Sequence, residues 1–77
     1  MKDVLQTRLD ELGITSYEVA KRVAKVRGKK VGEVTSSVSN VISEPERRRF
    51  DNLADVVRAM DGEIVIRWRS VNEEVIS

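Results

Sequence analysis

The chain has 77 residues, a net charge of +1 at pH 7, and neither Cys nor His. The absence of both residue types excludes disulfides and the usual zinc sites and removes the commonest catalytic bases and nucleophiles, so we expect no metal, no cofactor and no enzymatic activity. A single domain of this length buries only about 60% of the surface of its unfolded chain, so it needs tight helix packing or a partner subunit for stability.

The sequence also lacks signals for membranes or secretion. No stretch reaches the roughly 20 apolar residues of a membrane-spanning helix, and the first residues lack the apolar core of a signal peptide. With no Cys to indicate an oxidising compartment, we expect a cytoplasmic protein without a membrane partner.

The first third of the chain predicts two amphipathic helices. Three leucines at helical spacing mark the first helix: Leu5, Leu9 and Leu12. Gly13 then provides a helix stop, and Thr15 or Ser16 an N-cap for a second helix over residues 16–27. The second helix is expected to bury a stripe of small apolar side chains that could extend to a fourth member: Val19, Ala20, Val23 and Val26. Gly28 is the expected C-cap.

Residues 31–43 carry conflicting signals. Their many β-branched residues and serines locally favour a strand. The spacing of the valines is helical instead, at Val31, Val34, Val38 and Val41. We therefore predict one helix over 31–43, ended by Pro45. Opposite the valines, its polar face contains Ser36, Ser39, Asn40 and Ser43.

The last third predicts one helix and one strand. Five apolar residues at helical spacing are expected to be buried: Phe50, Leu53, Ala54, Val57 and Met60. Asp61 and Gly62 stop this helix, and residues 63–69 then alternate as a strand. One face of that strand carries Ile64, Ile66 and Trp68. Because the tail, 70–77, has no clear pattern, the expected fold is mainly α, with four to five helices and a single C-terminal strand.

Charge is distributed unevenly along the chain. Residues 1–20 hold two basic and four acidic side chains, residues 21–49 nine basic and three acidic, and residues 50–77 three basic and six acidic. The middle segment therefore carries +6 between segments of −2 and −3. A phosphate-facing surface on a near-neutral domain would show this asymmetry, although a solvated charged loop would show it too.

The helices expected at 16–27 and 31–43 could form a DNA-reading pair. Two short helices joined by a Gly-containing turn, the second polar on one side, form the arrangement that places a helix in the major groove. Ser, Thr and Asn reach base edges without filling that groove, whereas Lys, Glu or Ala would suit a merely solvated face better. We therefore expect DNA contacts from six side chains of the helix predicted over 31–43: Thr35, Ser36, Ser37, Ser39, Asn40 and Ser43.

Three stretches have apolar residues at the spacing expected of packed helices, and they succeed one another along the chain: residues 9–23, 37–41 and 50–62. In this order the chain resembles the phage Cro and repressor-like helix-turn-helix family, also called XRE, over about residues 5–62. Ala20 matches the small buried residue of the family's motif. The resemblance implies a lambda-repressor-like helical bundle in which residues 1–62 bind DNA, while residues 63–77 form a C-terminal strand and tail for dimerisation.

Two departures from the family pattern bear on the site. Family members usually carry Gln where Tyr17 stands. The resemblance places this residue against the DNA backbone, where the phenol could donate to a phosphate. The connection between the two motif helices is also longer than the usual four-residue turn, and it adds Lys29 and Lys30 as further candidates for phosphate contact.

A run of three arginines follows the second motif helix: Arg47, Arg48 and Arg49. In the family the corresponding loop lies against the sugar-phosphate backbone, so the resemblance implies phosphate contacts for this run. As the start of a helix the run would be unfavourable, because its charges oppose the positive end of the helix dipole. Phosphate contacts give affinity without sequence information and weaken as salt rises.

The C-terminal strand predicts an oligomer. One strand cannot form a sheet, and its exposed apolar edge favours pairing with another chain. We expect it to pair antiparallel with the same strand of a second subunit, although it could instead dock onto a partner protein. The expected interface contains Ile64, Val65, Ile66 and Trp68, with Val65 or Ile66 near the two-fold axis and Trp68 packed on a helix. A dimer would place two reading helices about 34 Å apart on DNA.

The residues and the resemblance together imply sequence-specific binding of double-stranded DNA by a transcriptional repressor of phage or mobile-element type, acting as a homodimer on a palindromic operator. The alternative is an antitoxin that neutralises a toxin or another protein partner through its C-terminal strand. RNA binding is poorly supported, because Tyr17, Phe50 and Trp68 offer no stacking platform. No pocket for a small-molecule substrate is expected in so short a chain.

Overall fold

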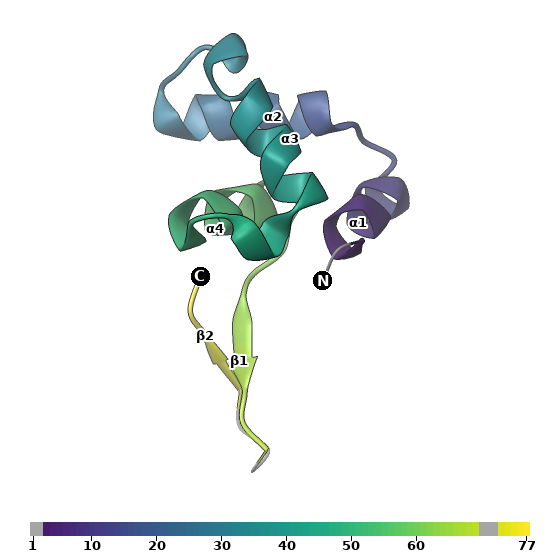
Figure 1. The fold of residues 1–77 in the computed structure, drawn as a ribbon, viewed down its shortest axis with the longest axis vertical. Coiled ribbons are helices and arrows are strands. Elements are labelled where there is room, and N and C mark those ends of the chain that lie inside the picture. The colour runs from purple at the N-terminus through teal and green to yellow at the C-terminus, as the bar shows by residue number, and fades with distance from the viewer. Residues whose placement is uncertain (1–2, 70–72) are drawn as a thin grey trace.

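The computed structural model describes residues 3–69 and 73–77. Within these residues the elements follow the order α1 (Val4–Leu12), α2 (Ser16–Arg27), η1 (Val31–Glu33), α3 (Thr35–Ser43), η2 (Pro45–Arg47), α4 (Phe50–Ala59), β1 (Val65–Arg67) and β2 (Glu73–Val75), where η marks a 3-10 turn. The helices form the body of the molecule, and the two strands extend from it beyond α4 (Figure 1). The prediction of a mainly α fold is confirmed. The described residues contain no helix long and apolar enough to cross a membrane, and no group of three His, Cys, Asp or Glu side chains placed to hold a metal ion.

The ends of α1 and α2 are determined locally by the residues expected to cap them. Gly13 ends α1 and Gly28 ends α2, each in a left-handed conformation with φ of 67° and 66°. A side chain would strain this conformation, which explains why glycine stands at both ends. Thr15 begins α2 by accepting a hydrogen bond from the Glu18 amide on its side-chain oxygen (3.3 Å). These predicted boundaries are confirmed.

The segment 31–43 is not the single helix that the valine spacing predicted. Val31–Glu33 form the 3-10 turn η1, and α3 begins only at Thr35. The Val34 amide closes the turn by donating to the Val31 carbonyl (3.0 Å). Residues three apart lie on the same side of a 3-10 turn, so both valines still pack with the core. The apolar spacing therefore predicted the correct face, and it predicted the α-helix correctly from Thr35 to Ser43 but wrongly for residues 31–33.

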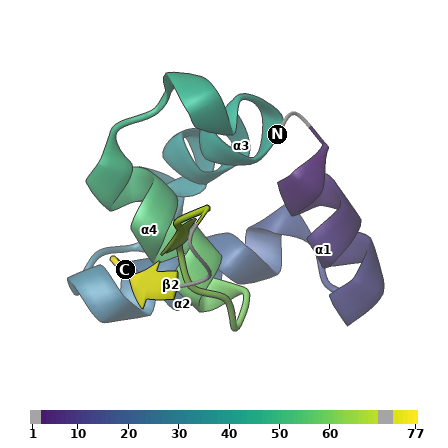
Figure 2. The same ribbon diagram turned by 90° about the horizontal axis from the view of Figure 1, so that it is seen from below.

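All four α-helices contribute to one core. α2 packs against α3 and α4, and α3 also packs against α1 and α4. Figure 2 shows the four helices around this centre, seen from the end at which the strands project. The buried apolar side chains of this core are Leu5, Leu9, Val19, Ala20, Val23, Ala24, Val34, Val38, Val41, Ile42, Val56 and Met60, and Ala54 of α4 is buried as well. This core holds α3 with its valines facing inward.

Four apolar residues are more exposed than the sequence indicated: Leu53 and Val57 are half-buried, and two others are exposed. Phe50 is 49% exposed and Val26 is 81% exposed. α4 carries apolar residues on two neighbouring faces, and the core takes the face with Val56 and Met60, so Phe50 stays at the surface. The inward stripe of α2 continues to Arg27, which contacts α4, and Val26 therefore falls outside that stripe.

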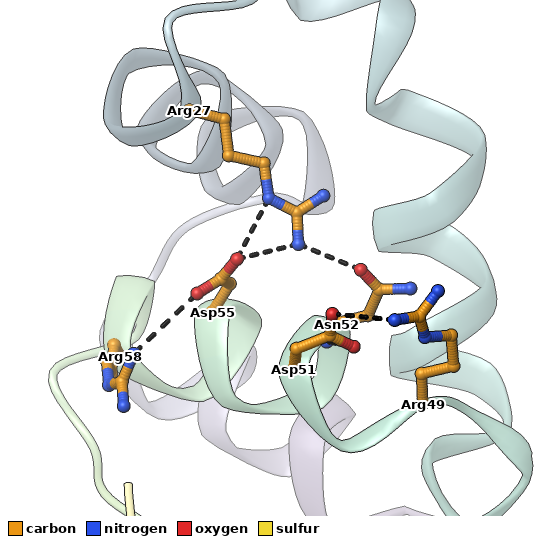
Figure 3. A network of polar contacts seen from close by, with 6 residues as sticks. All are labelled: Arg27, Arg49, Asp51, Asn52, Asp55 and Arg58. Carbon is orange, nitrogen blue, oxygen red and sulfur yellow. Dashed lines mark hydrogen bonds and ion pairs between the residues drawn. The ribbon is translucent and has the colours of Figure 1, made fainter.

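Polar contacts tie α2 to α4. Arg27 Nε and Nη2 both donate to Asp55 Oδ2, at 2.9 and 2.6 Å, and Nη2 also donates to Asn52 Oδ1 at 2.9 Å (Figure 3). Arg22 Nη1 donates to the Ala59 carbonyl (2.7 Å) at the C-terminal end of α4, where a cation offsets the helix dipole. These two arginines belong to the basic middle segment of the sequence, but they support the fold.

The tail supplies a second strand, so the prediction of a single C-terminal strand is wrong. β1 pairs antiparallel with β2, and the opposed residues are Val65 with Val75, Ile66 with Glu74, and Arg67 with Glu73. The two glutamates of β2 have weak β propensity, and the strand forms because β1 offers it an edge and Arg67 pairs with Glu73. We call the paired segment, residues 64–69 and 73–77, the ribbon. Residues 70–72 of the predicted tail lie outside the described residues.

Candidate nucleic-acid interface

The outer side of α3 is polar. The exposed residues on this side, which we call the α3 stripe, are Ser36, Ser39, Asn40 and Ser43. Their spacing of three and four residues places them on one side of the helix, opposite the buried Val38 and Val41. The predicted polar face is therefore confirmed as an exposed surface. Thr35 and Ser37 are half-buried beside it, and Thr35 Oγ1 donates to the Gly32 carbonyl (3.4 Å).

Most of the α3 stripe is available for binding. Ser43 Oγ donates to the Asn40 carbonyl at 3.3 Å. The side chains of Ser36, Ser39 and Asn40 make no hydrogen bond to any residue within 3–69 and 73–77. Hydroxyl and carboxamide groups both donate and accept, as the edges of base pairs require. The stripe therefore presents three uncommitted polar side chains on a helix whose back is buried.

The beginning of α2 lies beside the C-terminal half of the α3 stripe. A hollow of about 340 Å³ is lined by Asp3, Gln6, Ser16, Ser39, Ile42 and Ser43. Tyr17, the neighbour of Ser16, is exposed. The structure thus joins the start of α2 and the stripe into one surface. Gln6 and Ser16 were missed from the sequence, because only packing brings the starts of α1 and α2 to α3.

The two lysines of the connection lie at the other end of α2. Lys29 and Lys30 follow Gly28, and both are exposed and form no ion pair with the described part of the chain. The 12 residues of α2 span about 18 Å, which separates the lysines from Ser16. Because they precede η1 and α3, these cations flank the N-terminal end of α3 and are not part of the hollow.

The three arginines after α3 differ in their exposure and their partners. Arg47 Nε lies 3.5 Å from Glu44 Oε2, and Arg49 Nη2 lies 3.2 Å from Asp51 Oδ2 (Figure 3 shows the second pair). Both arginines are 80% exposed. Such ion pairs contribute at most about 1 kcal/mol, so a phosphate could replace either carboxylate. Arg48 is 32% exposed, and its Nε is buried without a hydrogen-bond partner in the described residues, so it belongs to the packing of the fold.

The sequence and the resemblance predicted phosphate contact for at least one of the three arginines, and the structure distinguishes them by exposure. Arg47 and Arg49 can reach a ligand, whereas most of the Arg48 side chain is covered. The acidic partners Glu44 and Asp51 were not predicted, although their position beside the arginine run is a visible signal. Comparison with protein-family models, with curated proteins and with solved structures found no match to this chain.

Proposed function

We propose that this protein binds double-stranded DNA in a sequence-specific way and represses transcription by covering its site. The observation that supports this most strongly is the α3 stripe, a row of short polar side chains on a helix held by buried valines, of which Ser36, Ser39 and Asn40 have no hydrogen-bond partner among the described residues. A helix fits the major groove of DNA, which is about 12 Å wide. Short Ser and Asn side chains let the backbone of such a helix come close to the base edges.

The α3 stripe would supply the base contacts. The Asn40 carboxamide can donate to and accept from the same adenine, and a contact of this kind discriminates between bases by about 1–3 kcal/mol. The hydroxyls of Ser36 and Ser39 can either donate or accept, so they add weaker preferences. We therefore expect Asn40 to determine more of the sequence preference than any serine of the stripe.

Cations at the two ends of α3 would supply the phosphate contacts. Lys29 and Lys30 precede the helix, and Arg47 and Arg49 follow it. Tyr17 adds a neutral donor at the start of α2. Neutralised phosphates release their counterions, so affinity should fall steeply as the salt concentration rises. These contacts would orient the protein on the duplex without selecting a sequence.

The test begins with selection from a random double-stranded DNA library, because the bound sequence is unknown. We expect a short motif to be enriched and to bind in a salt-dependent way when measured by fluorescence anisotropy. Asn40→Ala should change the preferred base at one or two positions of the motif. Arg47→Ala should weaken binding to every sequence alike and reduce the slope of log affinity against log salt by about 1.

Arg58→Ala is the matched control for Arg47→Ala. Both arginines are exposed, and each forms an ion pair with a carboxylate three residues earlier, Arg58 with Asp55 and Arg47 with Glu44. Arg58 lies on α4, outside the cations that flank α3, so its loss should leave the affinity and the salt slope unchanged. A library that yields no motif would contradict the proposal, and so would an Asn40→Ala variant that selects the original motif.

A further inference from the structure

A second surface of the molecule is apolar and contains no residue of the α3 stripe. A groove of about 500 Å³ lies between α1 and α4 and reaches the start of the ribbon. Its apolar lining includes Val4, Leu5, Phe50, Leu53, Val57 and Ile64. Phe50 is the residue of α4 that the core leaves half exposed. The groove therefore exposes to solvent the apolar side of α4 that is not buried in the core.

The ribbon continues this apolar surface. Ile64 lines the groove, and the alternation of side chains along a strand places Ile66 on the same side as Ile64. Trp68 directly follows β1, and continued alternation would place it on this side too. Glu74 stands opposite Ile66 in the register and so shares this face. Every residue of β1 and β2 is exposed, and Trp68 is 52% exposed. A two-stranded ribbon is marginally stable alone in water, so this face needs a partner to pack against.

We propose that the groove of one protomer receives the ribbon of a second copy, and that the exchange is reciprocal about a two-fold axis. A two-fold interface uses the same patch twice, so it requires a projecting part and a receiving part on one chain. Both parts are present here, and they meet at Ile64. The side chains of Ile66 and Trp68 fill the partner's groove beside Phe50. This contact differs from the pairing of strand edges that the sequence suggested.

The charges of the groove and of the ribbon support a second copy of this chain as the molecule that fills the groove. Arg8 is the one cation among the described residues that line the groove, and it forms no ion pair with them. Glu74 lies on the apolar face of the ribbon and has no ion-pair partner within 3–69 and 73–77 either. Glu11 and Glu63 also line the groove, so the attraction that favours a second copy is the local one between Arg8 of the groove and Glu74 on the apolar face of the ribbon.

The dimer leaves the α3 stripe free, because Ser36, Ser39 and Asn40 do not line the groove. It would present two copies of the candidate DNA-binding face, as a palindromic site requires. The inference does not depend on DNA binding, and it is tested without DNA. Its failure and the failure of the proposed function are therefore distinguishable.

Trp68 is the only tryptophan of the chain, so its fluorescence reports directly on docking. The experiment measures sedimentation velocity and tryptophan emission of the full chain over a dilution series. We expect a species of twice the chain mass that dissociates on dilution, with emission moving to longer wavelength as Trp68 becomes exposed. A monomer at every concentration would overturn the proposal. A dimer whose Trp68 emission stays that of a water-exposed ring would also overturn it, in favour of edge pairing.

Phe50→Glu and Val26→Glu form a matched pair of variants. Both place a carboxylate at an exposed apolar position of a helix, but only Phe50 lines the groove. Phe50→Glu should weaken the dimer about 30-fold or more, as expected for the loss of a central anchor. Val26→Glu should leave it unchanged. Circular dichroism should show both variants folded, and equal dimer affinities for the two would contradict the groove as the docking site.

A charge swap provides the second measurement. Glu74→Arg should weaken the dimer about fivefold, because it would place a cation beside the partner's Arg8. Adding Arg8→Glu to the same chain should restore much of the affinity, because the exchanged charges attract again. A double variant that binds no more tightly than Glu74→Arg alone would overturn this orientation of the ribbon in the groove.

Discussion

The α3 stripe and the surface formed by the groove and the ribbon are both exposed, but their chemistry suits opposite kinds of contact. The stripe consists of short side chains that exchange hydrogen bonds with water at little cost, so it is stable while uncovered. The groove and ribbon expose large apolar side chains, which gain free energy when another surface removes them from water. Exposure alone therefore does not identify a functional surface, whereas the chemistry of the exposed atoms indicates which ligand each surface suits.

The two regions also differ in what supports them. α3 rests on Val38 and Val41, which are buried in the core of the same chain. The strands of the ribbon have no buried residue. A single chain therefore positions the stripe by itself, whereas the ribbon would gain its packing from the second copy that we propose. This difference can be tested by weakening each kind of support in turn.

The largest effect is expected from removing the support of α3. Val41 is fully buried, and Val41→Ala removes two methyl groups and leaves a cavity. The free energy of unfolding should fall by about 2–3 kcal/mol, as measured by urea unfolding followed by circular dichroism. Ser39→Ala on the exposed side of the same helix is the control and should change it by less than about 0.5 kcal/mol. Equal losses in the two variants would contradict the inward orientation of the valines.

An intermediate effect is expected from the contact between α2 and α4. Arg27→Met keeps much of the apolar stem but removes the hydrogen bonds to Asp55 and Asn52, so the free energy of unfolding should fall by about 1–2 kcal/mol. The salt slope of DNA binding should not change, because Arg27 supports the fold and is not proposed to contact phosphate. A double-mutant cycle with Asp55→Asn should show coupling between the two residues, and strictly additive losses would argue against their contact.

The smallest effect is expected at the border of the candidate interface, and it is a gain. Glu44 lies near both Arg47 and Arg48, at 3.5 and 3.9 Å, so Glu44→Gln should free Arg47 for phosphate and tighten DNA binding by two- to fivefold, or roughly 0.5–1 kcal/mol. Glu46→Gln changes the net charge equally, and Glu46 forms no ion pair within the described ranges. Anisotropy titrations of both variants separate the release of Arg47 from general electrostatics. Equal gains would show that only net charge matters.

Local signals were sufficient to predict most helix boundaries. Gly13 and Gly28 stop their helices because they adopt a left-handed conformation, and Thr15 starts α2 by capping an amide. Periodicity was sufficient to place Val38 and Val41 on the inner side of α3 and the polar stripe on its outer side. These features depend on residues within one or two turns of each other, and for that reason the sequence by itself determined them.

The tertiary structure decided the features that depend on competition between distant residues. Two apolar faces of α4 competed for one core, and packing selected Val56 and Met60 and left Phe50 in a groove. A tail with little strand propensity became β2 because β1 offered an open edge. The basic residues were divided in the same way, since only folding brings Arg27 to Asp55 while leaving Arg47 exposed. No local rule places such partners, because their positions follow from how the whole chain buries its apolar surface.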